Sequence, residues 1–220
     1  FRALAETPRL RLVVGVVAVQ TIVDGAVDVL IVVLALETLD AGAAGLGFLN
    51  SAAGAGGLAA VLIAGGIAAR GRLASSLGVG IVLWGLPLVL IGVWPEQTVA
   101  LVLLAVVGAG GTLVAVTSDT LLQRAAPADI LARVFGAMDG VLLVALAIES
   151  LAAPLLVSAV GVRGALIAAG SLLPVLAALT WSRLAAIDAA ASIPVRALEL
   201  LRESPIFAPL PEPALEALAA

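Results

Sequence analysis

Two carboxylates lie in the first long apolar stretch of the sequence. Asp24 and Asp28 are four residues apart within residues 13–36, and this spacing places both on one face of a helix. An acidic side chain at the centre of a membrane helix costs about 2.5–3.5 kcal/mol, so such a pair is expected to face a bundle interior or a wet cavity. There it would serve as a proton-exchanging or cation-binding site. The alternative is a structural role, with both carboxylates bonded to neighbouring helices.

Further polar side chains occur in the fourth and fifth apolar stretches. Asp139 and Glu149 lie in the fifth stretch on neighbouring but distinct helix faces, and Asp119 ends the fourth within "TSDTLLQR". An acidic residue near the end of a span, such as Asp119, is more often part of a structural ion pair.

Small residues mark where helices could approach each other. Ala53 and Gly57 have the four-residue spacing that allows close helix packing. Gly108, Gly110 and Gly111 lie at mid-depth of the fourth stretch, where they predict either a bend with close substrate approach or tight packing alone.

The elements that carry these residues must lie in lipid. Hydrophobic residues make up 63% of the chain and charged residues 12%, with a mean hydropathy of +1.25, and a globule of this size could not bury so much apolar surface. The chain has no Cys and no His, which excludes disulfides, a His relay and a Cys/His metal site. No metal site, catalytic cluster or nucleic-acid partner is expected, so an enzyme is the least favoured class.

Six apolar stretches are long enough to cross a bilayer, and in lipid each must be helical. They lie at residues 11–36, 43–69, 73–94, 97–122, 134–159 and 161–183. The sequence therefore predicts an all-α, polytopic membrane protein with six transmembrane helices.

The arginines predict the orientation of these helices. Ten of the 11 cationic residues flank alternate loops and the two ends of the chain, while Arg163 alone lies on the other side. Because cytoplasmic loops are enriched in arginine, both termini should be cytoplasmic, in the cell (inner or plasma) membrane.

The last part of the chain differs in composition. Residues 184–197 are expected to be a linker, and residues 198–220 combine a short amphipathic helix with a Pro-rich turn and the start of another helix. The chain begins at Phe1 rather than Met, which predicts a piece of a longer protein.

Three segments resemble exporters of the major facilitator superfamily. "LLQRAAPADILARVFGAMDG" at 121–140 resembles the link between helices ten and eleven of those exporters, with matches at Gln123, Pro127, Arg133 and Val134. "GGIAARGRL" at 65–73 is similar to the family's Gly-x-x-x-Asp-Arg-x-Gly-Arg loop, although Ala69 stands where an Asp would be. The opening "FRALAETPRLRLV" looks like the approach to helix seven. Residues 1–183 thus resemble the C-terminal six-helix half of such a transporter, an inverted 3+3 repeat.

The resemblance implies roles for the polar residues. The first and fourth helices of each half line the cavity, the second and fifth form the interface between halves, and the third and sixth face lipid. Asp24 and Asp28 would line the cavity for proton coupling, and Asp139 and Glu149 would lie at or beside the moving interface. A cytoplasmic gate would comprise Arg70, Arg72, Asp119, Arg124 and Arg133. The missing N-terminal six-helix half would lie in the same longer chain or in a second copy.

The tail carries a second resemblance. "LELLRESPIFAPLPEPALEALA" at 198–219 resembles the start of a cyclic nucleotide-binding domain, in which Ile206, Phe207 and Leu210 would pack the helical lid. The chain stops before the part of that domain that contacts the nucleotide, so no cofactor is expected in residues 1–220. A cyclic nucleotide could bind in a longer parent protein. The alternative, without any nucleotide-binding role, is that residues 198–219 form a Pro-capped amphipathic helix.

Two functions of different classes follow. The first is a secondary active transporter, a proton-coupled antiporter that exports an amphiphilic small molecule and is regulated by a cyclic nucleotide. The alternative is a membrane anchor or receptor that carries a cyclic nucleotide-sensing domain and transports nothing. Substrate flux in liposomes would distinguish them.

Overall fold

The computed structural model describes residues 8–69, 73–125 and 131–191, and these ranges are helical apart from short turns. The elements in chain order are α2 (Pro8–Val33), the π-helix η1 (Leu34–Thr38), α3 (Gly42–Ala69), α4 (Leu73–Val93), α5 (Gln97–Ala125) and α6 (Leu131–Ala191). The predicted all-α class is confirmed for the described residues, in which there is no strand.

Five of these helices are long and apolar enough to cross a membrane. Their bounds follow the apolar stretches of the sequence closely, and the breaks between them fall at the predicted loops. This composition indicates a multi-pass membrane protein whose helices are compatible with a lipid bilayer.

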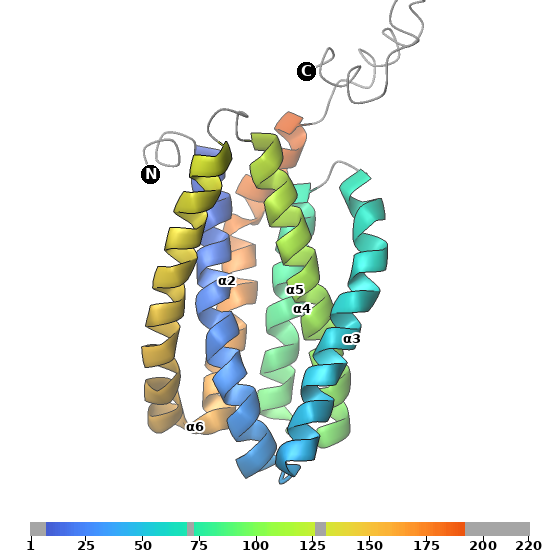
Figure 1. The fold of residues 1–220 in the computed structure, drawn as a ribbon, viewed down its shortest axis with the longest axis vertical. Helices are drawn as coiled ribbons and strands as arrows, with labels where there is room; N and C mark the ends of the chain where they lie inside the picture. Colours follow the sequence, from blue (N-terminus) through green and yellow to red (C-terminus); the bar gives the residue numbers. More distant parts are fainter. Residues whose placement is uncertain (1–7, 70–72, 126–130, 192–220) are drawn as a thin grey trace, which may run out of the picture.

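Helix α6 is interrupted at Gly161, inside the predicted "GVRG" break. Gly161 has a φ of 72° and a ψ of 173°, a conformation that L side chains rarely adopt and that glycine tolerates. The chain reverses direction there, so α6 consists of two antiparallel arms (Figure 1). The second arm continues to Ala191, into the segment predicted as a linker, because Leu184 is fully buried beside Gly78 of α4.

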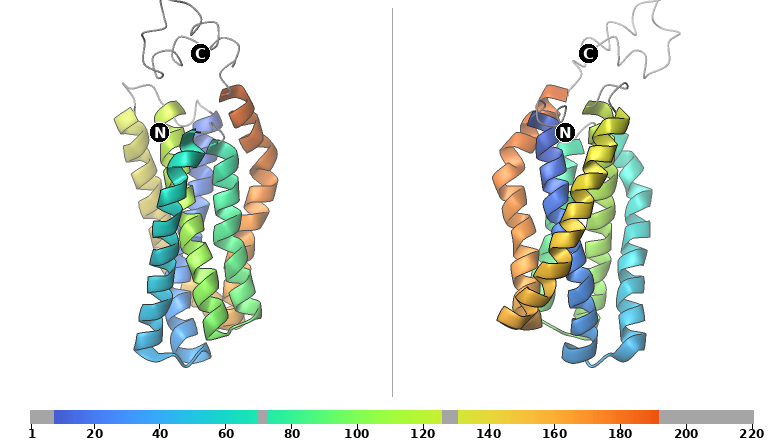
Figure 2. Two further views of the ribbon diagram at one scale, coloured as in Figure 1. Left: turned by 90° about the vertical axis from the view of Figure 1, so that its right-hand side faces the viewer. Right: turned by 60° about the vertical axis from the view of Figure 1, so that its left-hand side comes forward.

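The helices run nearly parallel to one long axis (Figures 1 and 2). The first arm of α6 and α3 lie on opposite flanks, with α2 and α5 between them (Figure 1). Helix α4 packs most extensively on α6 and α5, while α3 packs on α5 and α2 packs on α6. Pro8 and Ala191 lie at the same end of the bundle, which is also where α5 ends and α6 begins (Figure 2).

Glycines set the spacing of two helix pairs. A Cβ at Gly56 of α3 would overlap the Ala105 carbonyl oxygen of α5, and a Cβ at Gly108 would overlap the Ala53 carbonyl oxygen. Between α4 and α6, a Cβ at Gly85 would come within 2.6 Å of the Gly170 oxygen. Backbones approach this closely only where side chains are absent, as expected for the small residues around Ala53.

Apolar side chains cover the outer faces of the bundle. Leu58 and Leu62 of α3 are 73% and 87% exposed, and Leu151 and Leu155 of α6 are 73% and 68% exposed. Helix α4, expected to face lipid, buries one side against α5 and α6 and exposes a stripe formed by Val79, Leu83, Leu86, Leu90 and Val93. Apolar faces of this extent are typical of contact with lipid or with another protein.

The single arginine at the far end of the bundle caps a helix. Nε of Arg163 donates a hydrogen bond to the Gly92 carbonyl oxygen at 3.0 Å, and Nη2 donates one to the Val93 oxygen at 3.0 Å. These carbonyls belong to the last turn of α4 and have no partner within the helix, so the guanidinium satisfies them and complements the helix dipole.

Replacing Arg163 with glutamine should therefore lower the free energy of unfolding by about 1–2 kcal/mol. Arg183→Gln is the matched control, because Arg183 is exposed and makes no hydrogen bond within the described residues; its effect should stay within about 0.5 kcal/mol. Thermal unfolding in detergent measures both, and equal losses of stability would contradict the capping role.

Candidate functional site

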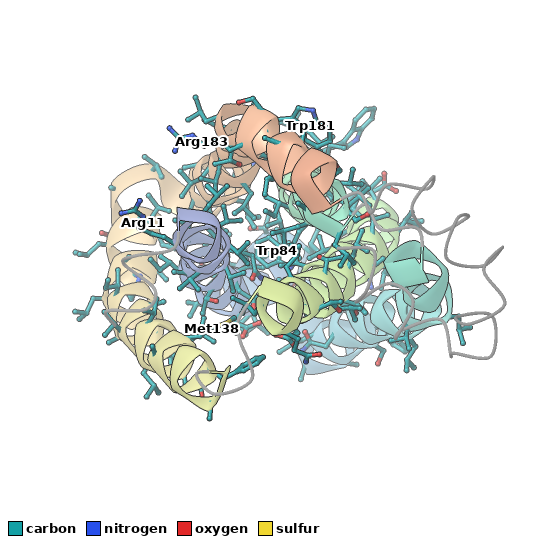
Figure 3. The ribbon with its side chains drawn as sticks, turned by 90° about the horizontal axis from the view of Figure 1, so that it is seen from above. Arg11, Trp84, Met138, Trp181 and Arg183 are labelled. Atoms are coloured by element: carbon teal, nitrogen blue, oxygen red, sulfur yellow. The ribbon has the colours of Figure 1, made fainter. Side chains whose placement is uncertain are left out.

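A pocket of about 330 Å³ opens between α2, α5 and the first arm of α6, with α4 behind it. Its polar lining comes from two helices: Gln20, Thr21 and Asp24 of α2, and Ser118 and Asp119 of α5. The remaining lining residues are Val17, Trp84, Gly111, Val114, Ala115, Met138 and Leu142. Seen from above, Trp84 lies near the centre of the bundle (Figure 3).

Helical periodicity explains why these residues share one pocket. Val17, Gln20, Thr21 and Asp24 are spaced by three and four residues, so they form one face of α2. The α5 lining from Gly111 to Asp119 repeats the same spacing. The pocket therefore lies between one face of α2 and one face of α5, and each face contributes polar side chains to the lining.

The two carboxylates lie at different depths. Asp119 is six residues from the end of α5 at Ala125, about 9 Å of helix, and Asp24 is sixteen residues from the start of α2 at Pro8, about 24 Å. Both of those helix termini lie at the same end of the bundle (Figure 2). Asp119 is thus near that end of the bundle, whereas Asp24 lies farther from it along the helix axis.

The hydroxyl groups of the lining are turned toward their own helices. Thr21 Oγ1 donates to the Val17 oxygen at 3.0 Å, and Ser118 Oγ donates to the Ala115 oxygen at 3.0 Å. The neighbouring hydroxyls of Thr117 and Thr120 also bond to carbonyls of α5. Because these protons are used within the helices, Thr21 and Ser118 offer the pocket acceptor lone pairs.

The sequence-predicted carboxylates do not all meet in this pocket. Asp24 lines it, and so does Asp119, which was assigned to the gate. Asp24 and Asp28 are both exposed, but Asp28, one turn further along α2, is not part of the lining. Asp139 is also exposed and follows Met138, which does line the pocket.

The other predicted gate and interface residues lie outside the described residues. This holds for Arg70 and Arg72, and for the side chains of Arg124, Arg133 and Glu149. Ile206, Phe207 and Leu210 of the tail are likewise outside them.

The mid-depth glycines of α5 serve two purposes. Gly108 and Gly110 pack against the backbones of α3 and α4, which agrees with the tight-packing interpretation. Gly111 instead borders the pocket, where an added Cβ would lie 3.2 Å from Nε1 of Trp84.

The charged side chains of the pocket lining are the carboxylates of Asp24 and Asp119, and no lining residue is cationic. Within the described residues, no group of three or more His, Cys, Asp or Glu side chains lies together. The lining therefore suits an uncharged or cationic organic ligand, or a proton.

Sequence reasoning missed Gln20 and Trp84 as pocket residues. Gln20 precedes Asp24 by four residues, so helical spacing could have placed it on the same face. Trp84 comes from α4, and only the packing of α4 behind the pocket brings it there.

Comparison with known proteins gives no match for this chain among family models, curated proteins or solved structures.

Proposed function

We propose that this chain forms the C-terminal half of a secondary active transporter of the major facilitator type, which exports an amphiphilic small molecule in exchange for protons. The observation that carries the proposal is the pocket, in which one face of α2 and one face of α5 each contribute a carboxylate. Intramembrane carboxylates that face a cavity are typical of ion and proton pathways.

The packing of the helices supports the inverted 3+3 repeat of this proposal. Helix α3 packs on α5 as α6 packs on α2, and α2 and α5 run in opposite directions (Figure 1). The inverted repeat relates α2 to α5, α3 to the first arm of α6, and α4 to the second arm of α6. Under this relation the packing of α3 on α5 corresponds to the packing of α6 on α2. In this scheme the two arms of α6 are separate spans, which gives six in all, and the pocket lies at the repeat interface where transporters bind substrate.

The orientation of the chain is also part of the proposal. Arg11 and Arg183 lie at the end of the bundle nearest the viewer in Figure 3, and Glu37, Asp40 and Glu96 lie at the turns of the other end. By the preference of cytoplasmic loops for arginine, the Arg11 end faces the cytoplasm, so Asp119 is on the cytoplasmic side of Asp24.

Labelling of engineered cysteines tests this orientation, because the chain has none of its own. A membrane-impermeant maleimide added to intact cells should label Ala41→Cys, at the turn between η1 and α3, but not Ala125→Cys at the end of α5. Permeabilised cells should label both variants. Labelling of Ala125→Cys alone in intact cells would show the reverse orientation.

The full natural chain reconstituted into liposomes tests the proposed function. With an imposed pH gradient, a labelled quaternary ammonium compound, which has no neutral form to cross the bilayer unaided, should accumulate on the acidic side, and collapsing the gradient with an ionophore should stop the accumulation. A non-transporting anchor would give no flux of any candidate substrate. Regulation by a cyclic nucleotide through residues 198–220 is a further part of the proposal, tested by adding cyclic AMP or cyclic GMP to the same assay.

A further inference from the structure

Two buried polar groups in the pocket have no partner in the described structure. Gln20 is 9% exposed and Trp84 is 3% exposed, and neither the Gln20 amide nor the Trp84 indole N–H makes a hydrogen bond within the described residues. Buried polar groups are almost always hydrogen-bonded, and leaving one unpaired is costly. Both groups line the same pocket, so both can bond to whatever enters it.

The Gln20 amide and the Trp84 indole N–H would both pair with a hydrogen-bond acceptor in the ligand. The indole N–H is only a donor, and the amide offers two donors and one acceptor oxygen. Nε1 of Trp84 lies beside Gly111, whose missing side chain leaves that edge of the indole open. A carbonyl or ether oxygen in the ligand would accept a hydrogen bond from the Gln20 amide or from the Trp84 indole N–H.

Three other polar residues of the lining, Thr21, Ser118 and Asp119, favour a cationic group in the ligand. Asp119 is a carboxylate that forms no ion pair or hydrogen bond within the described residues, and the Thr21 and Ser118 oxygens present lone pairs because their protons are donated to their own helices. No lining residue carries a positive charge. An ammonium group would pair with these acceptors, whereas an anion would be repelled.

The apolar lining limits the size and shape of the ligand. Val17, Val114, Met138 and Leu142 form its walls, and Met138 can adapt to irregular shapes. A volume of about 330 Å³ is at the small end of ligand pockets, so a compact ring or short alkyl group fits better than an extended chain.

We infer that the pocket binds a small organic cation that carries a hydrogen-bond acceptor oxygen, with Gln20 and Trp84 recognising the oxygen and Asp119 the ammonium group. This inference rests on the proposed function, since it names the substrate class of the same pocket. It is tested by binding, which does not require transport.

Equilibrium dialysis of the full natural chain in detergent, with three related probes, separates the two contacts. Lidocaine has a tertiary ammonium, a carbonyl oxygen and an aromatic ring. N,N-diethylbenzylamine keeps the ammonium and ring without the carbonyl, and 2,6-dimethylacetanilide keeps the carbonyl and ring without the ammonium. Lidocaine should bind most tightly of the three.

The variants Gln20→Leu and Asp119→Asn should then act differently. Gln20→Leu should weaken lidocaine binding roughly fivefold to tenfold and leave N,N-diethylbenzylamine unchanged. Asp119→Asn should weaken both amines by about tenfold or more. Gly54→Ala, on an open face of α3, should change neither, and circular dichroism with gel filtration checks that each variant is folded.

The outcomes divide clearly. The inference would be overturned if lidocaine showed no saturable binding or if 2,6-dimethylacetanilide bound equally well. It would also be overturned if Gln20→Leu left the lidocaine affinity unchanged, because water alone would then satisfy the buried amide. Binding as predicted without flux in liposomes would support the ligand class and refute the transport function. Flux of other substrates without lidocaine binding would refute the ligand class alone.

Discussion

Replacing Gly56 with alanine is expected to lower the free energy of unfolding by about 3 kcal/mol, the upper part of the range for overpacking in a close-packed interior. The added Cβ would overlap the carbonyl oxygen of Ala105, and a backbone atom cannot rotate away as a flexible side chain can. Helices α3 and α5 would have to separate. Because α3 packs mainly on α5, it has little other contact to compensate.

Gly54→Ala is the matched control on the same helix. Nothing lies within 4 Å of a Cβ added at Gly54, so this change should be neutral or should stabilise α3 by up to about 1 kcal/mol, the difference in helix propensity between glycine and alanine. Thermal unfolding of both variants in the same detergent measures the contrast. Similar unfolding temperatures would mean that α3 and α5 do not touch backbone to backbone.

Replacing Asp24 with asparagine should reduce proton-coupled flux by at least about 100-fold, the usual minimum contribution of a positioned proton-transfer group. Asp24 is the α2 carboxylate of the pocket and lies about 24 Å along the helix from the start of α2. Because asparagine preserves the size and polarity of the side chain, the protein should remain folded. Asparagine cannot release a proton, so only the coupling to protons should be lost. Substrate counterflow, which needs no proton movement, should be reduced much less than flux driven by a pH gradient.

Asp28→Asn is the control for this second prediction. Asp28 lies one turn away on the same helix, and although both side chains are exposed, only Asp24 is part of the lining. Replacing Asp28 should therefore leave coupled flux within about twofold of the unmodified protein. If Asp28→Asn removes coupling and Asp24→Asn does not, the proton pathway does not run through the pocket.

Much of the fold could be predicted from the sequence, because in lipid an apolar stretch has no alternative to a helix. The loops "ETLDAGAAG" and "GVRG" marked breaks, and the structure has positive φ angles there at Asp40, Gly42 and Gly161. The continuation of α6 to Ala191 could not be foreseen. It depends on the contact of Leu184 with α4, and local composition does not reveal such a contact.

The candidate site was predicted in part. The presence of Asp24 in an apolar helix marked it as a pocket residue, since charge at that depth needs a polar environment. Helical spacing places Asp24 and Asp28 on the same face of the helix and so predicts the same role for both. Spacing does not reveal at which height along the bundle axis the neighbouring helix offers polar side chains. Asp119 and Trp84 join the pocket because α5 and α4 border it together with α2. Glycine contacts between α4 and α5 bring Trp84 beside Gly111, and local sequence does not reveal such contacts.

The most direct test is to measure proton movement caused by substrate. Liposomes containing the full natural chain and an internal pH-sensitive dye would be given a quaternary ammonium substrate, which carries no exchangeable proton and has no neutral form, in the absence of any other gradient. If the pocket lined by Asp24 and Asp119 is the site of proton-coupled transport, entry of the substrate should move protons across the membrane in the opposite direction. Asp24→Asn should abolish this proton movement. Transport of the substrate with no dye response, or an unchanged response in Asp24→Asn, would contradict this role of the pocket.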